Sequence, residues 1–385
     1  MIDWTLADPL VAAVEADVAE VFAVHDARVQ ATPTGKAVVL FGEFLRGSEL
    51  VYQTIAPRLE AHGLLTMLRR EGDRDVIIGQ PAPPAPGKRR TWINLALFIA
   101  TVASTIFAGA FQQLSQEQMT RVESSASGGE VAYRLVAEVL SIWPSGIPFM
   151  LALLGILGVH ELGHYFAGRW YKLPVSLPYF IPFPINYLTG TLGAVIRIDG
   201  PFASRKALFD VGIAGPLAGL AVAIPVTILG LMQAELVPVA GAGGIIFQEP
   251  ILFRSLARIV VGARPPGMDL SMNPLLMAGW WGFLVTAINL FPVSQLDGGH
   301  INYALFGRAH KWVAWSMYAV ALLVTFSNTE SMAYVLMLGL ILFMGLTHPP
   351  ALDDVSPVGG WRTLLGLATL VLFFLLITPN PIAFG

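Results

Sequence analysis

Residues 146–164 read GIPFMLALLGILGVHELGH, and this stretch decides the fold. Its apolar part continues into a predicted membrane-spanning helix at about 148–170. Side chains four residues apart share one face of a helix, so His160 and His164 can present two imidazole nitrogens to one metal ion. Glu161 is then placed to take a proton from a metal-bound water. The alternative is a pair of helical histidines near a membrane interface, beside a capping or paired glutamate.

Two features favour the metal site. Ionisable groups in an apolar helix are costly and usually serve a function, and a second motif downstream offers a third ligand. Residues 289–300 read NLFPVSQLDGGH and follow another apolar run. Asp297 is the predicted third ligand. His300 could compete with it, but Gly298 and Gly299 should turn the chain away after Asp297. Taken alone, Asp297 would be read as a solvated carboxylate just beyond a span.

The composition indicates a membrane protein. Of the 385 residues, 55% are hydrophobic and 13% are charged, whereas a soluble globular protein carries about 25% charged residues. We therefore predict an α-helical polytopic membrane protein with about six to eight spans. The net charge of -3 argues against a nucleic-acid partner. The chain has no cysteine, so a metal site must use histidine and carboxylate ligands.

The N-terminal residues 1–80 lack a long apolar run and predict a small soluble α+β domain. We expect helices at 10–22 and 48–62 and strands at 37–44, 64–68 and 75–79. The chain start lacks the pattern of a signal peptide, so we expect no cleaved leader. Residues 81–90 form a Pro-rich, basic linker, and Lys88-Arg89-Arg90 before the first span predicts that this end stays in the cytoplasm.

Residues 91–385 form the predicted transmembrane domain, with apolar runs at 92–111, 148–170, 209–232, 276–292, 311–326, 332–346 and 361–377. Alternation of these runs brings Asp297 to the same membrane side as the histidine pair, near the cytoplasmic face. Residues 173–200 are apolar but interrupted by prolines, so they should be re-entrant or form a β-hairpin. This segment could pair with an extended peptide, or it could be a structural plug. Small residues at 214–219 favour close helix packing.

These motifs resemble those of the site-2 proteases, which are intramembrane zinc metalloproteases. The stretch from His160 to His164 is similar to their zinc motif, and residues 289–298 are similar to their NxxP…LDG motif. Residues 214–219 are similar to a glycine-proline element that lies between the two. Residues 190–198, followed by Phe209-Asp210-Val211, are similar to the plastid and bacterial branch, which has a soluble N-terminal domain and no PDZ domain.

The resemblance implies one Zn²⁺ per chain, held by His160, His164 and Asp297, with the zinc-bound water activated by Glu161. It also implies that Asn289 helps to position the substrate backbone. The alternative is an asparagine that satisfies the carbonyl groups at the helix end. The expected partners are the lipid bilayer and a transmembrane protein substrate, whose identity stays open, as does the oligomeric state. The expected location is a bacterial inner membrane, with the N-terminal domain and the active-site end cytoplasmic.

Two other functions stay open at this point. One is a catalytically silent membrane protein that uses the same fold to bind membrane segments. The other is a metal transporter that uses the histidines and the aspartate as transit ligands. A transporter would more often show internal repeats with broken helices in matching halves, and the sequence shows no such repeat. The presence of Glu161, which is not a ligand, favours hydrolysis over silent binding.

Overall fold

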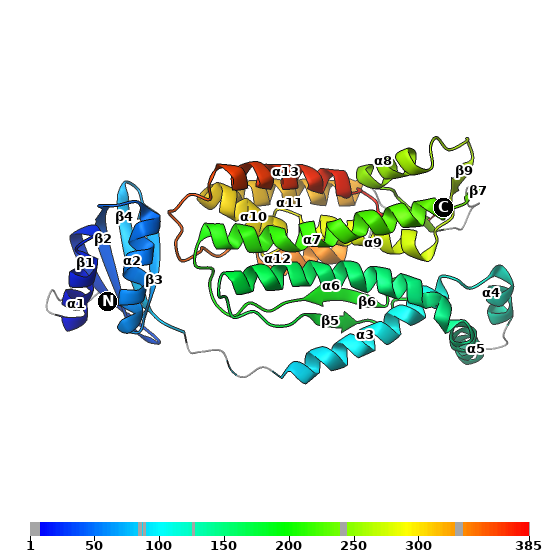
Figure 1. The fold of residues 1–385 in the computed structure, drawn as a ribbon, viewed down its shortest axis with the longest axis horizontal. Coiled ribbons are helices and arrows are strands. Elements are labelled where there is room, and N and C mark those ends of the chain that lie inside the picture. Colours follow the sequence, from blue (N-terminus) through cyan, green and yellow to red (C-terminus); the bar gives the residue numbers. More distant parts are fainter. Residues whose placement is uncertain are drawn as a thin grey trace.

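The computed structural model describes residues 8–83, 87, 90–124, 128–238, 245–327 and 334–384 (Figure 1). The predicted linker lies partly outside the described residues, because 84–86, 88 and 89 fall between these ranges. The chain is mostly helical with small sheet regions, as predicted.

The N-terminal part combines two helices with a four-stranded antiparallel sheet of order β1-β2-β4-β3. The two helices cover one face of the sheet, where Val14 and Ile55 are buried in one cluster with Leu40 and Leu68. The elements are α1 (Pro9–Val18), β1 (Phe22–Thr32), β2 (Gly35–Phe44), α2 (Ser48–Ala61), β3 (Leu64–Glu71) and β4 (Arg74–Pro81).

Strand β1 is missing from the sequence prediction, which extended the first helix to Phe22. The helix ends at Val18, and Phe22 instead begins a strand that pairs with β2. Most side chains of β1 are half-buried, so the strand lacks the alternation of apolar and polar residues that marks a one-sided strand.

The rest of the described chain is a helical bundle with three two-stranded sheets, β5-β6, β7-β9 and β8-β10 (Figure 1). Its helices are α3 (Thr91–Phe111), α4 (Gln116–Glu123), α5 (Gly128–Ser141), η1 (Trp143–Gly146), α6 (Ile147–Trp170), α7 (Arg205–Met232), α8 (Ile251–Val260), α9 (Pro274–Asn289), α10 (Asp297–Phe306), η2 (Gly307–Ala309), α11 (His310–Ser327), α12 (Val335–Met344) and α13 (Gly360–Leu376). Its strands are β5 (Tyr179–Pro182), β6 (Thr191–Val195), β7 (Leu236–Pro238), β8 (Ile245–Phe247), β9 (Met268–Leu270) and β10 (Ile382–Phe384).

Three helical stretches of the described chain are long and apolar enough to cross a membrane, namely 91–111, 143–170 and 205–232. Helices α9, α12 and α13 are apolar but shorter. These findings support a membrane protein, whereas the count of six to eight spans stays a prediction.

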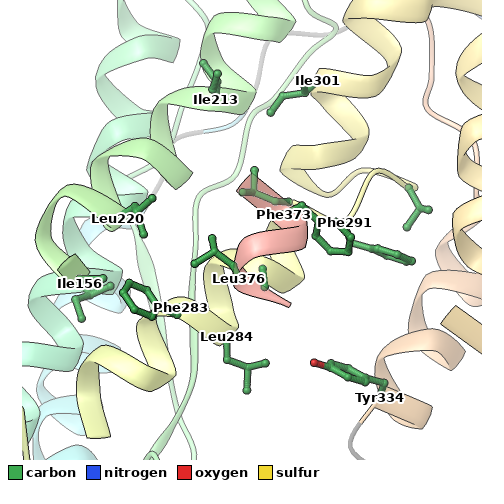
Figure 2. Close-up of a cluster of buried hydrophobic side chains, with 14 of the residues drawn as sticks. Ile156, Ile213, Leu220, Phe283, Leu284, Phe291, Ile301, Tyr334, Phe373 and Leu376 are labelled. Atoms are coloured by element: carbon green, nitrogen blue, oxygen red, sulfur yellow. The ribbon is translucent and has the colours of Figure 1, made fainter. Parts of the chain in front are cut away.

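Helix α7 lies at the centre of the bundle and packs against α6, α9 and α10. Figure 2 shows part of the core between these helices, where Ile213 and Leu220 of α7 face the same buried cluster as Ile156 of α6 and Phe283 of α9. Phe373 brings α13 into this cluster. A central α7 therefore fixes the relative positions of α6 and α10, the two helices that carry the candidate ligands.

A β-hairpin follows α6, in the segment where the sequence predicted a re-entrant or hairpin structure. Strands β5 and β6 pair antiparallel, with Phe180 opposite Ala194. Gly190 precedes β6 with φ 72°, and a Cβ there would lie 2.3 Å from the carbonyl oxygen of Ser104 in α3. Only glycine allows both this left-handed turn and this close approach. That the hairpin is re-entrant within a bilayer stays a prediction.

Candidate metal centre

Helix α6 carries the two histidines on one face, as their spacing requires. The Nε2 atoms of His160 and His164 lie 3.1 Å apart. Both side chains are buried, with 3% and 6% of their surface exposed. Imidazoles that face each other inside an apolar bundle need a partner that satisfies both nitrogens.

Asp297 supplies that partner from the first residue of α10. Its Oδ2 atom lies 3.3 Å from the Nε2 of His160 and 3.3 Å from the Nε2 of His164. Within the described ranges this is the one group of three or more potential metal ligands, and its donor atoms lie within 4.8 Å of one another. The structure thus brings together three groups that the sequence places on two distant helices.

The donor set fits zinc in its chemistry and its spacing. Two imidazoles and one carboxylate form the three-ligand set of catalytic zinc sites, which keep a fourth position open. Ligand atoms about 2.0–2.1 Å from a tetrahedral zinc ion lie roughly 3.3 Å from one another, close to the separations of 3.1 and 3.3 Å seen here.

A backbone carbonyl fixes the tautomer of His164. The Nδ1 atom of this imidazole lies 2.7 Å from the carbonyl oxygen of Val211 in α7. A carbonyl can only accept, so Nδ1 carries the proton and Nε2 keeps its lone pair for a metal. The sequence gives no sign of this role for Val211, because a backbone acceptor leaves no signal in residue type.

Glycines of α7 leave the space that the histidines occupy. A Cβ on Gly215 would lie 2.0 Å from the Nε2 of His164, and one on Gly219 would lie 3.0 Å from the Cβ of His160. On α6, a Cβ on Gly163 would lie 2.6 Å from the carbonyl oxygen of Ala214. The small residues at 214–219 are packing residues, as predicted, and they also shape the metal site.

Glu161 lies beside the histidines and is 7% exposed. Its carboxylate interacts with the backbone amide of Ile196, which follows β6. Together with the three candidate ligands it lines a pocket of ≈ 240 Å³, called here the metal pocket. The pocket is lined by His160, Glu161, His164, Ala194, Val195, Ile196, Ile198, Val211, Asn289, Gln295, Leu296, Asp297 and His300.

Asn289 ends α9 close to the site, with its Nδ2 3.4 Å from the Nε2 of His160. It lines the metal pocket and can therefore reach both the histidine and a molecule bound beside it.

His300 lies outside the ligand group. Its Nδ1 lies 2.7 Å from the Nε2 of His348, and its Cβ lies against Gly212 of α7. His348 and His310 are both buried, at 7% exposed each. The His348 backbone amide donates to the Nε2 of His310 at 3.1 Å.

Gly298 and Gly299 do not turn the chain away, contrary to the sequence prediction. They form the first turn of α10, which begins at Asp297. A Cβ on Gly298 would lie 2.0 Å from the carbonyl oxygen of Leu290, and one on Gly299 would lie 2.3 Å from that of Ser294. The glycines instead let the start of α10 pack directly on the preceding backbone.

Comparison with known proteins agrees with this geometry. Residues 148–326 match the model of peptidase family M50. The chain is 30% identical over 311 residues to the probable zinc metalloprotease EGY1, chloroplastic, of Oryza sativa subsp. japonica. The aligned region covers 76% of this chain and 52% of that protein. It is 32% identical over 361 residues to the probable zinc metalloprotease EGY2, chloroplastic, of Oryza sativa subsp. indica. Here the aligned region covers 90% of this chain and 62% of that protein. No solved structure shows a significant match.

The chain spans a little over half the length of the curated relatives that it matches, with 52% and 54% of the two EGY1 proteins covered. The matched family region contains α6, α7, α9 and α10, and so it includes every candidate ligand. The family match and the homology to the chloroplast EGY proteins confirm the resemblance, and residues 148–326 carry a domain of peptidase family M50, the site-2 protease family.

Proposed function

We propose that this protein is a zinc metallopeptidase that hydrolyses peptide bonds in or near membrane-spanning segments of other proteins. The observation that carries the proposal is the group formed by the buried His160 and His164 and the half-buried Asp297, beside Glu161. The names of the relatives support zinc as the metal and peptide hydrolysis as the reaction.

The proposed division of labour follows from the geometry. His160, His164 and Asp297 hold one zinc ion per chain, and the Val211 carbonyl keeps His164 in the ligating tautomer. When bound, zinc supplies a Lewis acid that polarises the attacking water and the scissile carbonyl. Glu161 takes the proton from the water and later delivers it to the leaving amine.

The proposed substrate lies along the metal pocket as an extended strand. A helical substrate hides its carbonyl groups in hydrogen bonds, so it must unwind before hydrolysis, and glycine or proline in its span would ease this step. Residues 194–196 line the pocket beside Glu161 and can offer a strand edge to the unwound segment. In this proposal Asn289, which also lines the pocket, holds the substrate backbone.

The proposed location is a membrane, with α3, α6 and α7 as spans. The basic residues Lys88, Arg89 and Arg90 directly before α3 favour a cytoplasmic N-terminal domain, and hence a metal site near the cytoplasmic face. A bacterial inner membrane is the proposed compartment, although the matched relatives are chloroplast proteins.

The test is a cleavage assay with purified full-length protein in liposomes. The substrates are a panel of single-span reporter proteins whose apolar segments carry Gly-Pro pairs at different depths. Zinc is measured by mass spectrometry on the same samples. We expect Glu161→Gln to keep one zinc ion per chain and to abolish cleavage, whereas the control Glu235→Gln, on an exposed side chain, keeps both.

Two results would contradict the proposal. Cleavage by Glu161→Gln at the wild-type rate would remove the glutamate from the mechanism. Failure of the wild-type protein, loaded with zinc, to cleave any reporter would favour the catalytically silent function.

A further inference from the structure

Residues 348–356, called here the strap, run between the N-terminal domain and the helical bundle. On the bundle side, the Leu352 amide donates to the Phe202 carbonyl at 2.8 Å, and the Asp353 amide donates to the Ala203 carbonyl at 3.0 Å. These acceptors precede α7, so the strap is hydrogen-bonded to the segment that leads into the central helix.

On its other side, the strap pairs with β3, the edge strand of the N-terminal sheet. The Leu68 amide donates to the Leu352 carbonyl at 2.8 Å, and Leu68 forms a parallel bridge with Asp353. Arg69 donates from Nη1 to the carbonyl oxygens of Ala351 at 2.7 Å and Leu352 at 2.9 Å. The N-terminal domain therefore holds the strap through backbone and side-chain donors.

Further contacts secure the same junction. The hydroxyl groups of Ser48 and Ser356 lie 2.9 Å apart. Tyr303 of α10 donates to Asp354 at 2.7 Å, and Arg308 donates to the Arg70 carbonyl. The strap thus links the N-terminal domain to α10, the helix that begins with the candidate ligand Asp297.

A cavity of ≈ 330 Å³, called here the strap cavity, lies beneath the first residues of the strap. It is lined by Ile196, Ile198, Gly200, Pro201, Phe202, Leu208, Gln295, His300, His348, Pro349, Pro350 and Ala351. Four of these residues, Ile196, Ile198, Gln295 and His300, also line the metal pocket. The two cavities therefore share a wall.

The chain segment that lines both cavities can pair with an extended peptide. The chain from β6 passes along the metal pocket at Val195 and Ile196 and then along the strap cavity up to Phe202. A strand paired with this segment would run from one cavity into the other. Gln295 is exposed, and its amide makes no hydrogen bond with the described part of the chain, so it can donate to and accept from a peptide backbone.

We propose that the strap cavity is a subsite for the extended peptide that flanks the scissile bond, and that Leu68 and Arg69 of the N-terminal domain hold its roof in place. This inference rests on the proposed function. It gives the N-terminal domain a part in substrate binding, because removal of its hydrogen bonds would leave residues 349–352 supported on the bundle side alone.

Cysteine crosslinking tests the subsite, because the chain has no native cysteine and each variant then carries a single thiol. Three exposed positions form a matched set in the Glu161→Gln background, which leaves the reporter uncleaved. Val195→Cys lies in the metal pocket alone, Pro350→Cys lies in the strap cavity alone, and Pro357→Cys lies on the same connection but lines neither cavity. The reporters carry single cysteines through the span and its flank, and copper phenanthroline drives disulfide formation.

The expected result is that Val195→Cys and Pro350→Cys capture the reporter at different, neighbouring stretches and at alternate positions, as an extended chain requires. Pro357→Cys should capture none. Capture by Val195→Cys but not by Pro350→Cys would overturn the subsite, with the proposed function intact. Such a result is expected if water alone fills the strap cavity. No capture at Val195→Cys would contradict the proposed function itself.

A second measurement tests the role of the N-terminal domain. In the cleaving enzyme, Arg69→Ala removes the donor to the strap, whereas Arg74→Ala removes an exposed arginine at the first residue of β4. We expect KM for the reporter to rise about tenfold in Arg69→Ala with kcat little changed, as for loss of a binding interaction. An unchanged KM, or a fall in kcat alone, would overturn the role of Arg69.

Discussion

The Nδ1 atom of His164 lies 2.7 Å from the carbonyl oxygen of Val211, and this contact joins α6 to α7 at the metal site. The imidazole can rotate only if it gives up that hydrogen bond. Asp297 approaches the opposite nitrogen from α10 at 3.3 Å. The candidate ligand is thus oriented from both sides before any metal binds.

Removal of the carboxylate should abolish stoichiometric zinc binding. We expect Asp297→Ala to bind far less than one zinc ion per chain, because two imidazoles alone leave the ion with too few protein ligands. Asp73→Ala, in an exposed turn of the N-terminal domain, should bind zinc as the wild type does. Mass spectrometry of the purified, dialysed proteins measures the ratio. Equal zinc content in the two variants would remove Asp297 from the site.

A methyl group on α7 should displace His164. Gly215→Ala places a Cβ 2.0 Å from the Nε2 of His164, so the imidazole or the helix must shift. We expect a loss of zinc affinity of about 10-fold to 100-fold, as when a group that orients a ligand is removed. Gly155→Ala on α6 meets no heavy atom within 4 Å and is the matched control. Competition with a fluorescent zinc chelator measures both, and wild-type affinity in Gly215→Ala would show that the site tolerates the shift.

The ion pair between Arg362 and Asp210 should hold the Val211 carbonyl in the position where it accepts the hydrogen bond from His164. Arg362 binds both oxygens of Asp210 at 2.8 Å, and Tyr171 donates to the same carboxylate at 2.5 Å. Because Asp210 precedes Val211, we expect Arg362→Gln to lower zinc affinity about tenfold. We also expect it to lower the free energy of unfolding by about 2 kcal/mol.

Arg258→Gln, which changes an exposed arginine of α8, is the control for this prediction. Chelator competition and thermal unfolding in detergent measure the two effects separately. If Arg362→Gln lost stability but kept its zinc affinity, the ion pair would have a structural role only.

The N-terminal domain should lose stability at high pH through Tyr52. Burial, and then the negative charges of Asp353 and Glu60, raise the pKa of Tyr52 from 10.0 to about 12. Below pH 10 both the folded and the unfolded chain keep the proton. As pH rises from 10 to about 12, the unfolded chain releases it first, so the free energy of unfolding falls.

Circular dichroism melting of the full-length protein across this pH range measures the loss. Tyr52→Phe has no proton to lose at this position, so its melting temperature should fall less steeply than that of the wild type. Parallel curves for the two proteins would exclude Tyr52 as a source of the pH dependence.

The sequence predicts the candidate ligands because their chemistry is local. The spacing of His160 and His164 places them on one helical face, and the alternation of spans brings Asp297 to the same side. What the sequence could not predict is backbone geometry. The Val211 carbonyl has no residue signal, and Gly298-Gly299, which usually mark a turn, here let a helix begin against the Leu290 and Ser294 carbonyls.

The pairing of the strap with β3 and with the segment before α7 could also not be predicted from the sequence. Its partners at Leu68 and Phe202 lie far from Leu352 along the chain, and its prolines and aspartates indicate only a loop. The same limit applies to β1, whose half-buried side chains show no clear periodicity. Pairing between distant segments depends on tertiary packing, which local propensity does not contain.

The order of the ligands along the chain has a consequence for biosynthesis. Helix α6 leaves the ribosome before α10, because α7, α8 and α9 lie between them. A nascent chain that ends before Asp297 has two imidazoles but lacks the third donor. The complete set of candidate ligands therefore forms only when α10 docks on α7, so the proposed peptidase cannot become active before α10 has been synthesised.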